Sequence, residues 1–387
     1  MRLNLDKSHW KRVAFGDVVR NVSETVRDLE AAGIDRVIAM EHMGPGELKI
    51  SRWGSTEDGT TFTRRVKPGQ TLFGKRRAYQ RKVAYAEFDA ICSGDIYTFE
   101  ADEAQLRGDL LPFLVQSDGF FEHALGTSAG SLSPRTNWRD LKDFEFDLPA
   151  LDEQKRIADL LWSVERHRNK LSSMPAKLTS VYDTWLEHRL AEVPTARLDE
   201  VVRLQHGRPV SSALYGKGEF PLLRPGDMNA DGTVAWSDTT VRIAQEFVDQ
   251  HRDWVLAPGD LVINMTAQTL DDRFLGRVCR MHDHALLNQR IGRLQSDDRV
   301  SIDYAFVALH TAAFAAWVAR RSEGSKIKHM HWRHIADFAI PIPSAAEQDA
   351  IVAEATVWKE AGQQTLEELD ALVALRASII AEIFGGD

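Results

Sequence analysis

The residues with the most distinctive chemistry lie between Arg64 and Lys82, a stretch with eight basic residues and no acid. Within it, the run "GKRRAYQRK" (74–82) combines arginine and lysine with tyrosine and glutamine. Guanidinium and ammonium groups bind phosphates, and glutamine hydrogen-bonds to base edges. The segment therefore indicates either a nucleic-acid contact or an ordinary solvated face, which is what many charge runs are.

A second basic stretch, "SEGSKIKHMHWRH" (322–334), places lysine, histidine and arginine after a Gly-Ser turn. The pair His329 and His331 could suggest a metal site. However, no carboxylate or further histidine lies at a ligand spacing from them. We predict no metal.

Motifs for catalysis are not found in the sequence. It has no GxxxxGK[ST] phosphate loop, no HExxH, no GxSxG, and no Asn-Pro-Pro or Asp-Pro-Pro methyltransferase box. Glu153-Gln154 recurs as Glu347-Gln348. Acids are favoured in the first turn of a helix by the helix dipole, so we predict a structural role for these pairs. The absence of these motifs disfavours an enzyme without excluding one, and a stand-alone nuclease or methyltransferase with an unrecognised site is the enzymatic alternative.

Composition sets the protein class. The 387 residues are enough for two or three domains, and two cysteines without a CxxC pair argue against disulfides and thiolate zinc sites. No signal peptide or membrane-spanning run is present, so we expect a cytoplasmic protein. The net charge is −9, and residues 345–387 carry nine acids against two basic residues. Most of the negative charge thus lies in this tail, away from the basic segments.

The sequence contains an internal repeat. Residues 138–154 match residues 332–348 at seven of 17 positions, without a gap and at an offset of 194. A period this long predicts a duplicated domain with a connector rather than a solenoid. Short β-like runs and turn signals in each copy predict an α+β fold.

Each copy ends in a heptad pattern, which predicts two long helices packed as an antiparallel coiled coil. Pro175 should kink or break the first helix, and Gly362 should weaken the second. The predicted helix-interface residues are Ile157, Val164, Leu171, Leu178, Trp185, Ile351, Trp358, Leu372 and Ile379.

Four stretches in this order make the chain similar to the specificity subunits of type I restriction-modification systems. They are "GKRRAYQRKVAYAEFDAICSGDI" (74–96), "FDLPALDEQKRIADLL" (146–161), "GRPVSSALYGKGEFPLLRPGDM" (207–228) and "FAIPIPSAAEQDAIV" (338–352). The resemblance implies two target recognition domains (1–150 and 193–343), each followed by a spacer helix (151–192 and 344–387), related by a pseudo-twofold repeat.

The resemblance also implies a function. Such a chain binds a bipartite, asymmetric site in double-stranded DNA and does no chemistry itself. It holds two modification subunits, which bring S-adenosylmethionine and methylate adenine, and motor-nuclease subunits join for cleavage. The remaining alternative is a two-domain scaffold that binds protein or RNA and uses its heptads to dimerise.

Placed on this sequence, the resemblance predicts DNA contacts in both domains. In the first they are Lys75, Arg76, Arg77, Tyr79, Gln80, Arg81, Lys82, Ser131 and Arg135. In the second they are Arg208, Ser211, Gln268, Arg290, Ser325, Lys326 and Lys328.

Overall fold

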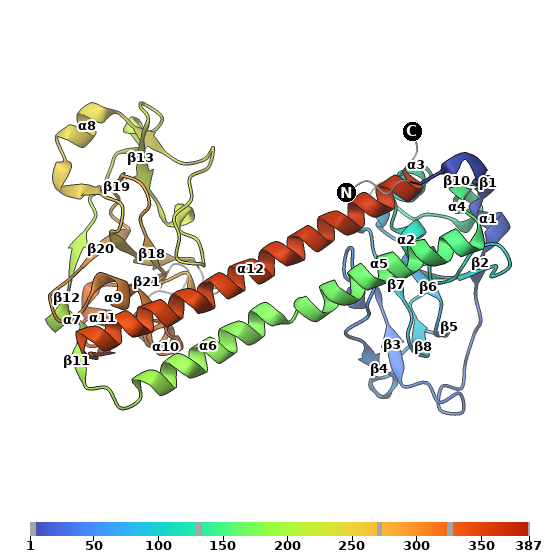
Figure 1. The fold of residues 1–387 in the computed structure, drawn as a ribbon, viewed down its shortest axis with the longest axis horizontal. Helices are drawn as coiled ribbons and strands as arrows, with labels where there is room; N and C mark the ends of the chain where they lie inside the picture. The colour runs from blue at the N-terminus through green and yellow to red at the C-terminus, as the bar shows by residue number, and fades with distance from the viewer. Residues whose placement is uncertain (1–4, 129–133, 269–272, 323–327, 386–387) are drawn as a thin grey trace. The chain divides into compact units, whose positions relative to one another are not determined.

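The structure, a computed structural model, describes residues 5–128, 134–268, 273–322 and 328–385 (Figure 1). The chain divides into two compact units. Unit 1 comprises Met1–Ser173 and Leu366–Asp387, and unit 2 comprises Met174–Thr365. The predicted DNA contacts Ser131, Ser325 and Lys326 lie outside the described residues.

Unit 1 contains two four-stranded sheets and a two-stranded ribbon formed by β1 and β10. The first sheet has the order β2–β9–β6–β7 and is antiparallel throughout. The second has the order β4–β3–β8–β5, in which β3 and β8 are parallel. The strands are β1 (Lys11–Ala14), β2 (Val19–Val22), β3 (Arg36–Ile38), β4 (Gly54–Ser55), β5 (Arg64–Val66), β6 (Thr71–Gly74), β7 (Val83–Tyr85), β8 (Ala90–Cys92), β9 (Ile96–Ala101) and β10 (Glu145–Leu148).

Helices cover the first sheet of unit 1. They are α1 (Phe15–Val18), α2 (Leu111–Val115), α3 (Asp118–Gly126) and α4 (Trp138–Leu141). Strand β6 is buried along its whole length because it lies between two strands and beneath α2. Phe73 of this strand packs against Phe99 and Phe120, with ring centroids 6.0 and 5.6 Å away. The hydroxyl of Ser117 caps α3 by accepting a hydrogen bond from the Phe120 amide.

Unit 2 repeats this architecture. Its sheets have the orders β12–β20–β16–β18 and β14–β13–β19–β15, and β13 and β19 are the parallel pair. The strands are β11 (Thr195–Arg197), β12 (Val202–His206), β13 (Phe220–Leu223), β14 (Arg242–Ile243), β15 (Val255–Leu256), β16 (Leu261–Asn264), β17 (Thr266–Ala267), β18 (Val278–Arg280), β19 (Ala285–Leu287), β20 (Ile291–Ser296), β21 (Lys328–His329) and β22 (Ala339–Pro341). The short helices are α7 (Leu198–Val201), α8 (Gln245–Asp249), α9 (Ile302–Ala308), α10 (Ala312–Arg321) and α11 (Trp332–Ile335).

The two units therefore have one topology, which confirms the predicted duplication and the α+β class. The repeated glutamines show how the sequence encodes it. The side-chain amide of Gln154 donates to the carbonyls of Gln105 and Pro149 and accepts from the Arg107 amide. Gln348 makes the same three bonds, to Arg299, Pro343 and Ser301. Both glutamines are buried, so their recurrence has the structural role that we predicted.

In unit 1, helix α5 (Leu151–Leu171) packs against the last part of α12 (Ala345–Phe384). Their shared core includes Ile157 and Ile379, and the fully buried Glu165 accepts hydrogen bonds from Arg168 at 2.6 Å and Arg376 at 2.8 Å. Burial would raise the pKa of Glu165, but the two arginines outweigh it and lower that pKa. The ion cluster joins the two helices.

In unit 2, helix α6 (Met174–Leu190) and the first part of α12 contribute to one core, which contains Leu186 and Ile351. The break that Pro175 predicts lies between α5 and α6, at residues 172–173. Helix α12 continues through Gly362 as one helix, so the glycine does not break it, and the predicted weakening there stays a prediction. A glycine costs about 1 kcal/mol in a helix, which its neighbours can offset.

The other predicted helix-interface residues vary in burial. Val164 lies in the core of unit 1, and Leu372 packs against that core. Trp185 packs against the core of unit 2. Leu171, Leu178 and Trp358 are half-buried.

Candidate nucleic-acid interface

The basic segment of unit 1 forms the connection between β6 and β7, residues 75–82, which we call loop 1. Main-chain contacts tie loop 1 to a segment far away in the sequence. The Arg77 amide donates to the Pro134 carbonyl at 2.9 Å, and Arg76 and Arg135 form a β-bridge. The predicted residue Arg135 is thereby brought beside the predicted residue Arg76.

A cluster of cations surrounds one carboxylate at the start of loop 1. Asp95 lies 3.5 Å from the Arg76 guanidinium and 3.3 Å from that of Arg135. Burial is the main cause that lowers the pKa of Lys75, and the positive charges of Arg64 and Arg135 lower it further. Arg76 and Arg135 are 44% and 58% exposed. The cluster is thus net positive and accessible to an anion.

The second half of loop 1 divides into exposed and internally bonded side chains. Tyr79 is 55% exposed, and Arg77 is also exposed. In contrast, Arg81 donates to Asp118 at 2.5 Å, and the Lys82 ammonium donates to the Met40 carbonyl at 2.6 Å. DNA contact by these residues stays a prediction, but Arg81 and Lys82 already have protein partners.

The corresponding connection of unit 2, residues 265–277, is called loop 2. It is tied down in the same way, because β17 in loop 2 pairs with β21 and places Lys328 opposite Ala267. The Met265 amide donates to the Arg290 carbonyl at 2.9 Å. Three predicted residues therefore gather around loop 2: Gln268, Arg290 and Lys328.

A cavity of about 440 Å³ opens beside loop 2. Its lining includes the predicted residues Gln268 and Arg290, together with Arg224, Asn288 and Gln289. Cationic and amide side chains of this kind bind phosphates and base edges. Arg224, Asn288 and Gln289 were not among the residues predicted from the sequence, and only the arginine in "LLRPGD" carries a charge that could have indicated a site.

The remaining predicted residues of unit 2 lie nearby. Arg208 forms a β-bridge with Asn288, and its guanidinium lies 5.0 Å from the Trp254 ring. Ser211 is exposed, but its hydroxyl caps a short 3-10 helix at Ser212–Leu214. Arg208 therefore adjoins the cavity, whereas Ser211 has a local structural role.

Other chemistry finds no support in the described part of the chain. No group of three or more histidine, cysteine, aspartate or glutamate residues there could hold a metal ion. Burial raises the pKa of Cys92 and of Cys279 to about 12, which makes both thiols poor nucleophiles. No described helix is by itself long and apolar enough to cross a membrane. Helices α9 and α10 taken together have the length and apolar composition of a span, but a bend separates them.

Comparison with known proteins decides the family. The model of the type I restriction modification DNA specificity domain matches twice, at residues 10–175 and 191–383. The chain belongs to this family. The first match lies almost wholly in unit 1, whereas the second covers most of unit 2 and continues into the part of α12 that belongs to unit 1. The resemblance predicted from the sequence is confirmed.

Two characterised relatives support this assignment. The specificity subunit of the type I restriction enzyme MjaVIII from Methanocaldococcus jannaschii is 19% identical over 57% of this chain and 57% of its own length. The specificity subunit of the Escherichia coli enzyme EcoDI is 29% identical over 39% of this chain and 33% of its own length. The matched regions thus span about half and a third of these relatives.

Solved structures share the fold. A chain from a study of complex assembly and conformational transition of the type I R-M system has a TM-score of 0.62 at 18% identity, with 98% of both chains covered. The S subunit of a type I restriction-modification system from M. genitalium has a TM-score of 0.61 at 15% identity, with both chains fully covered. At these identities the likeness concerns the fold alone.

Proposed function

We propose that this chain recognises a bipartite, asymmetric sequence in double-stranded DNA, with one half bound by each unit. One observation supports this most. Both units present a connection between equivalent strands at the same place, with cationic and amide side chains around it, but the side chains themselves differ. A repeated frame with unlike side chains is what two different half-sites require.

In unit 1, Arg76, Arg77 and Arg135 would bind phosphates. Each phosphate neutralised by a cationic side chain releases condensed counterions, so the affinity would fall steeply with salt. This attraction does not depend on sequence. Discrimination would come from loop 1 side chains that reach base edges, such as Gln80, at about 1–3 kcal/mol for each good pair.

In unit 2, the cavity beside loop 2 would supply both kinds of contact. Arg224 and Arg290 carry the positive charge, and Gln268, Asn288 and Gln289 offer paired donors and acceptors. An amide side chain can bind adenine through two hydrogen bonds, whereas arginine can bind guanine in the same way. The second half-site would therefore be recognised by different residue types from the first.

The long helices would connect the two binding events. We propose that they pair as an antiparallel coiled coil, an interpretation supported by the α5–α12 core of unit 1 and the α6–α12 core of unit 2. Once one half-site is bound, a linked second domain meets its own half-site at a high effective concentration. Two moderate affinities would then give one selective complex.

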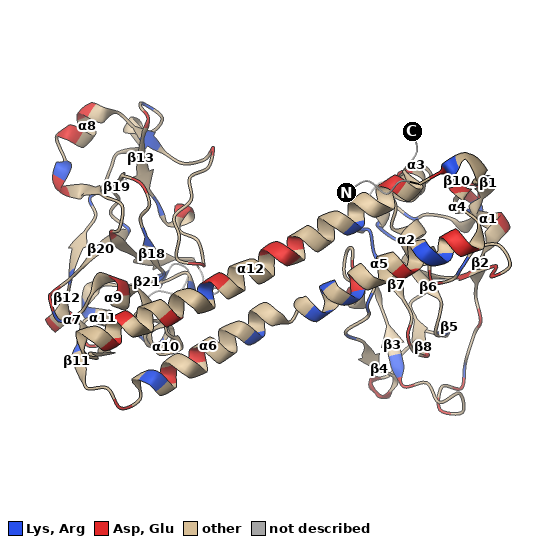
Figure 2. Cartoon of the chain, viewed as in Figure 1, with Lys and Arg blue, Asp and Glu red and all other residues tan. Residues whose placement is uncertain are grey.

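Partner subunits would supply the chemistry. We propose that two modification subunits, carrying S-adenosylmethionine, methylate adenine in the bound DNA, and that motor-nuclease subunits join for cleavage. Helix α12 carries a surplus of acidic residues, which disfavours contact with phosphate and favours contact with protein (Figure 2). The chain itself would be a non-catalytic scaffold.

Co-expression tests the assignment. The chain is co-expressed with the products of the neighbouring reading frames, and methylated adenines are mapped across genomic DNA. We expect one motif with two defined halves and an undefined spacer. Absence of methylation, or a motif with only one part, would contradict the proposal and favour a scaffold for protein or RNA. Methylation by this chain alone would indicate an unrecognised active site.

A double variant tests loop 1. Arg76→Ala combined with Arg77→Ala should abolish methylation by the assembled complex, because two cations of the first half-site are lost, while assembly is unchanged in size-exclusion chromatography. The control is Arg139→Ala on α4, which removes an arginine that is 84% exposed. Normal methylation by the double variant would remove loop 1 from the DNA-binding surface.

A further inference from the structure

Both loops contain an arginine in a backbone conformation that arginine rarely adopts. Arg81 in loop 1 and Arg273 in loop 2 each have a φ of 51°. Among the described residues, three that are not glycine have a positive φ, and all three are arginines in these loops: Arg77, Arg81 and Arg273. Such a conformation costs on the order of 1 kcal/mol, so the surrounding contacts must hold it in place.

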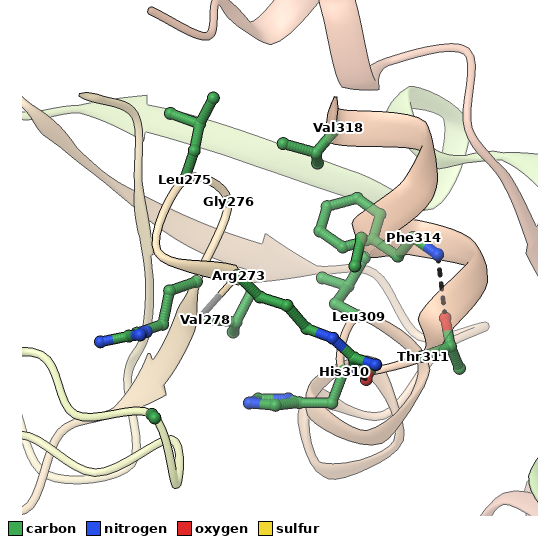
Figure 3. Close-up of a pocket in the computed structure, with 12 residues that line it drawn as sticks. Arg273, Leu275, Gly276, Val278, Leu309, His310, Thr311, Phe314 and Val318 are labelled. Atoms are coloured by element: carbon green, nitrogen blue, oxygen red, sulfur yellow. Dashed lines mark hydrogen bonds between the residues drawn. The ribbon is translucent and has the colours of Figure 1, made fainter. Parts of the chain in front are cut away.

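The side chains of Arg81 and Arg273 make the same contact in the two units. Arg81 donates to the Gln116 carbonyl at 3.1 Å, and Arg273 donates to the His310 carbonyl at 3.2 Å. Figure 3 shows the Arg273 guanidinium beside His310. Gln116 directly precedes Ser117, the cap of α3, and His310 directly precedes Thr311, the cap of α10.

The contact is kept although the loops around it differ. Loop 1 runs from residue 75 to 82 and loop 2 from 265 to 277, so loop 2 is five residues longer. The two acceptor residues, by contrast, lie 194 positions apart, the offset of the sequence repeat. An unchanged contact inside a changed loop indicates a role shared by both units rather than recognition of one half-site.

Each of these arginines also has an acidic partner within the protein. Arg81 is paired with Asp118 at 2.5 Å, and its guanidinium lies 4.6 Å from the Phe121 ring. Arg273 is paired with Asp183 of α6 at 3.6 Å. A guanidinium with a carboxylate and a carbonyl as partners must give up protein contacts to bind a phosphate.

We propose that Arg81 and Arg273 are positioning residues, which fix loop 1 to the α2–α3 junction and loop 2 to the α9–α10 junction without contacting DNA. Fixed in this way, the other described side chains of each loop would meet the DNA in one register. The role of DNA rests on the proposed function, whereas the anchoring of the loops does not.

Hydrogen exchange of the full-length chain tests the anchoring. In Arg81→Ala, the amides of Arg77 and Gln80, which bond within and next to loop 1, should exchange about tenfold faster or more, because the loop opens more often. The amides of Met265 and Arg277 in loop 2 should be unaffected. Arg273→Ala should show the reverse pattern. Unchanged exchange in the variant's own loop would overturn the proposal.

Matched controls separate anchoring from general loss of structure. Arg139→Ala in unit 1 and Arg252→Ala in unit 2 remove arginines that are 84% and 78% exposed, and neither should alter exchange in the loops. Should an alanine variant fail to fold, Arg81→Lys keeps the charge and a donor. Its loop 1 exchange should lie between that of the wild type and that of fully exposed amides.

DNA binding by the assembled complex distinguishes positioning from contact. With a duplex that carries the mapped motif, Arg81→Ala should weaken binding about tenfold without changing the slope of log affinity against log salt concentration. A slope smaller by about 0.9 would mean that a phosphate contact was lost, and would overturn the proposal. Unchanged affinity would also overturn it. If the wild-type complex binds no specific sequence, the proposed function fails, while the exchange result still decides the anchoring.

Discussion

The two recognition domains share their main-chain hydrogen bonds but differ in the side chains attached to them. The Lys75 amide donates to the Asp95 carbonyl in unit 1, and the Met265 amide donates to the Arg290 carbonyl in unit 2. The residue whose carbonyl accepts this bond is thus acidic in unit 1 and basic in unit 2. Because the main-chain bonds hold the frame, the side chains at this position can differ between the two units.

The helices differ between the units in a second way. In unit 1, α5 and α12 share the buried pair of Glu165 and Arg376. At the repeat offset of 194, the corresponding residues of unit 2 are Lys359 and Tyr182. Unit 2 therefore has no equivalent pair at these positions. The duplicated fold tolerates either arrangement, which allows the contribution of the ion cluster to be measured against an internal reference.

The largest effect is expected from Glu165→Ala. It leaves the buried Arg376 and the half-buried Arg168 without their carboxylate, and breaking a buried pair costs about 3–5 kcal/mol. We expect this loss in the free energy of unfolding of unit 1, measured by chemical denaturation. The control is Lys359→Ala, at the corresponding place in unit 2. It should change the free energy of unfolding of unit 2 by less than about 0.5 kcal/mol. Equal effects would show that the buried cluster is not what distinguishes the two helix pairs.

A smaller effect is expected at the position that holds Asp95 in unit 1 and Arg290 in unit 2. Arg290→Ala should reduce DNA affinity by about 1–3 kcal/mol if the side chain contacts a base, and should lower the salt slope if it contacts phosphate. Asp95→Asn should do the opposite and raise affinity, because it removes the carboxylate between Arg76 and Arg135. Fluorescence anisotropy over a salt series measures both. A loss of DNA affinity in Asp95→Asn would contradict the idea that the charge at this position sets the attraction for DNA in each unit.

The helix caps should respond equally in both units. Ser117→Ala and Thr311→Ala each remove a hydroxyl that accepts an amide hydrogen bond, which costs about 1 kcal/mol. Thermal melting of the two variants should show similar shifts. Clearly different shifts would mean that the shared frame is not equally important in the two copies.

The smallest effect concerns pH. The pKa of Glu165 is lowered in the folded state, so its ionised form stabilises unit 1 above the unfolded value of about 4.5. This stabilisation is lost as the pH falls below 4.5 through the folded pKa. The difference in unfolding free energy between wild type and Glu165→Gln should therefore shrink on acidification, as urea titrations at pH 7 and pH 3.5 would show. If this difference instead grew on acidification, the pKa of Glu165 would be raised, not lowered, in the folded state.

Two features of the fold, the repeated glutamines and the break between α5 and α6, could be predicted from the sequence for physical reasons. The repeat of Gln154 and Gln348 was visible because a buried amide with three main-chain bonds tolerates no other residue type of similar shape. The break at Pro175 followed from the missing amide and fixed φ of proline. The continuity of α12 through Gly362 could not be predicted in this way. The cost of glycine in a helix can be offset by neighbouring contacts, which the sequence alone does not locate.

The sites were harder to predict than the fold. Arg135 and Arg76 were both predicted, but only the pairing of distant segments shows that they share Asp95. The cavity residues Asn288 and Gln289 were missed because uncharged amides are common on any surface. Basic runs also gave no means to separate Arg76 from Arg81, since the internal partner Asp118 lies 37 residues further along the chain.

The assignment of residues 366–387 to unit 1 has a consequence for synthesis of the protein. The core of that unit contains Ile379, Ile380, Ile383 and Phe384, beside residues that the ribosome made more than 200 positions earlier, such as Ile157. The amino-terminal unit can therefore complete its core only after residue 384 has been made. A nascent chain that stalls or is truncated before this point leaves a folded second unit and a first unit with exposed apolar surface, which is a form that chaperones and proteases recognise.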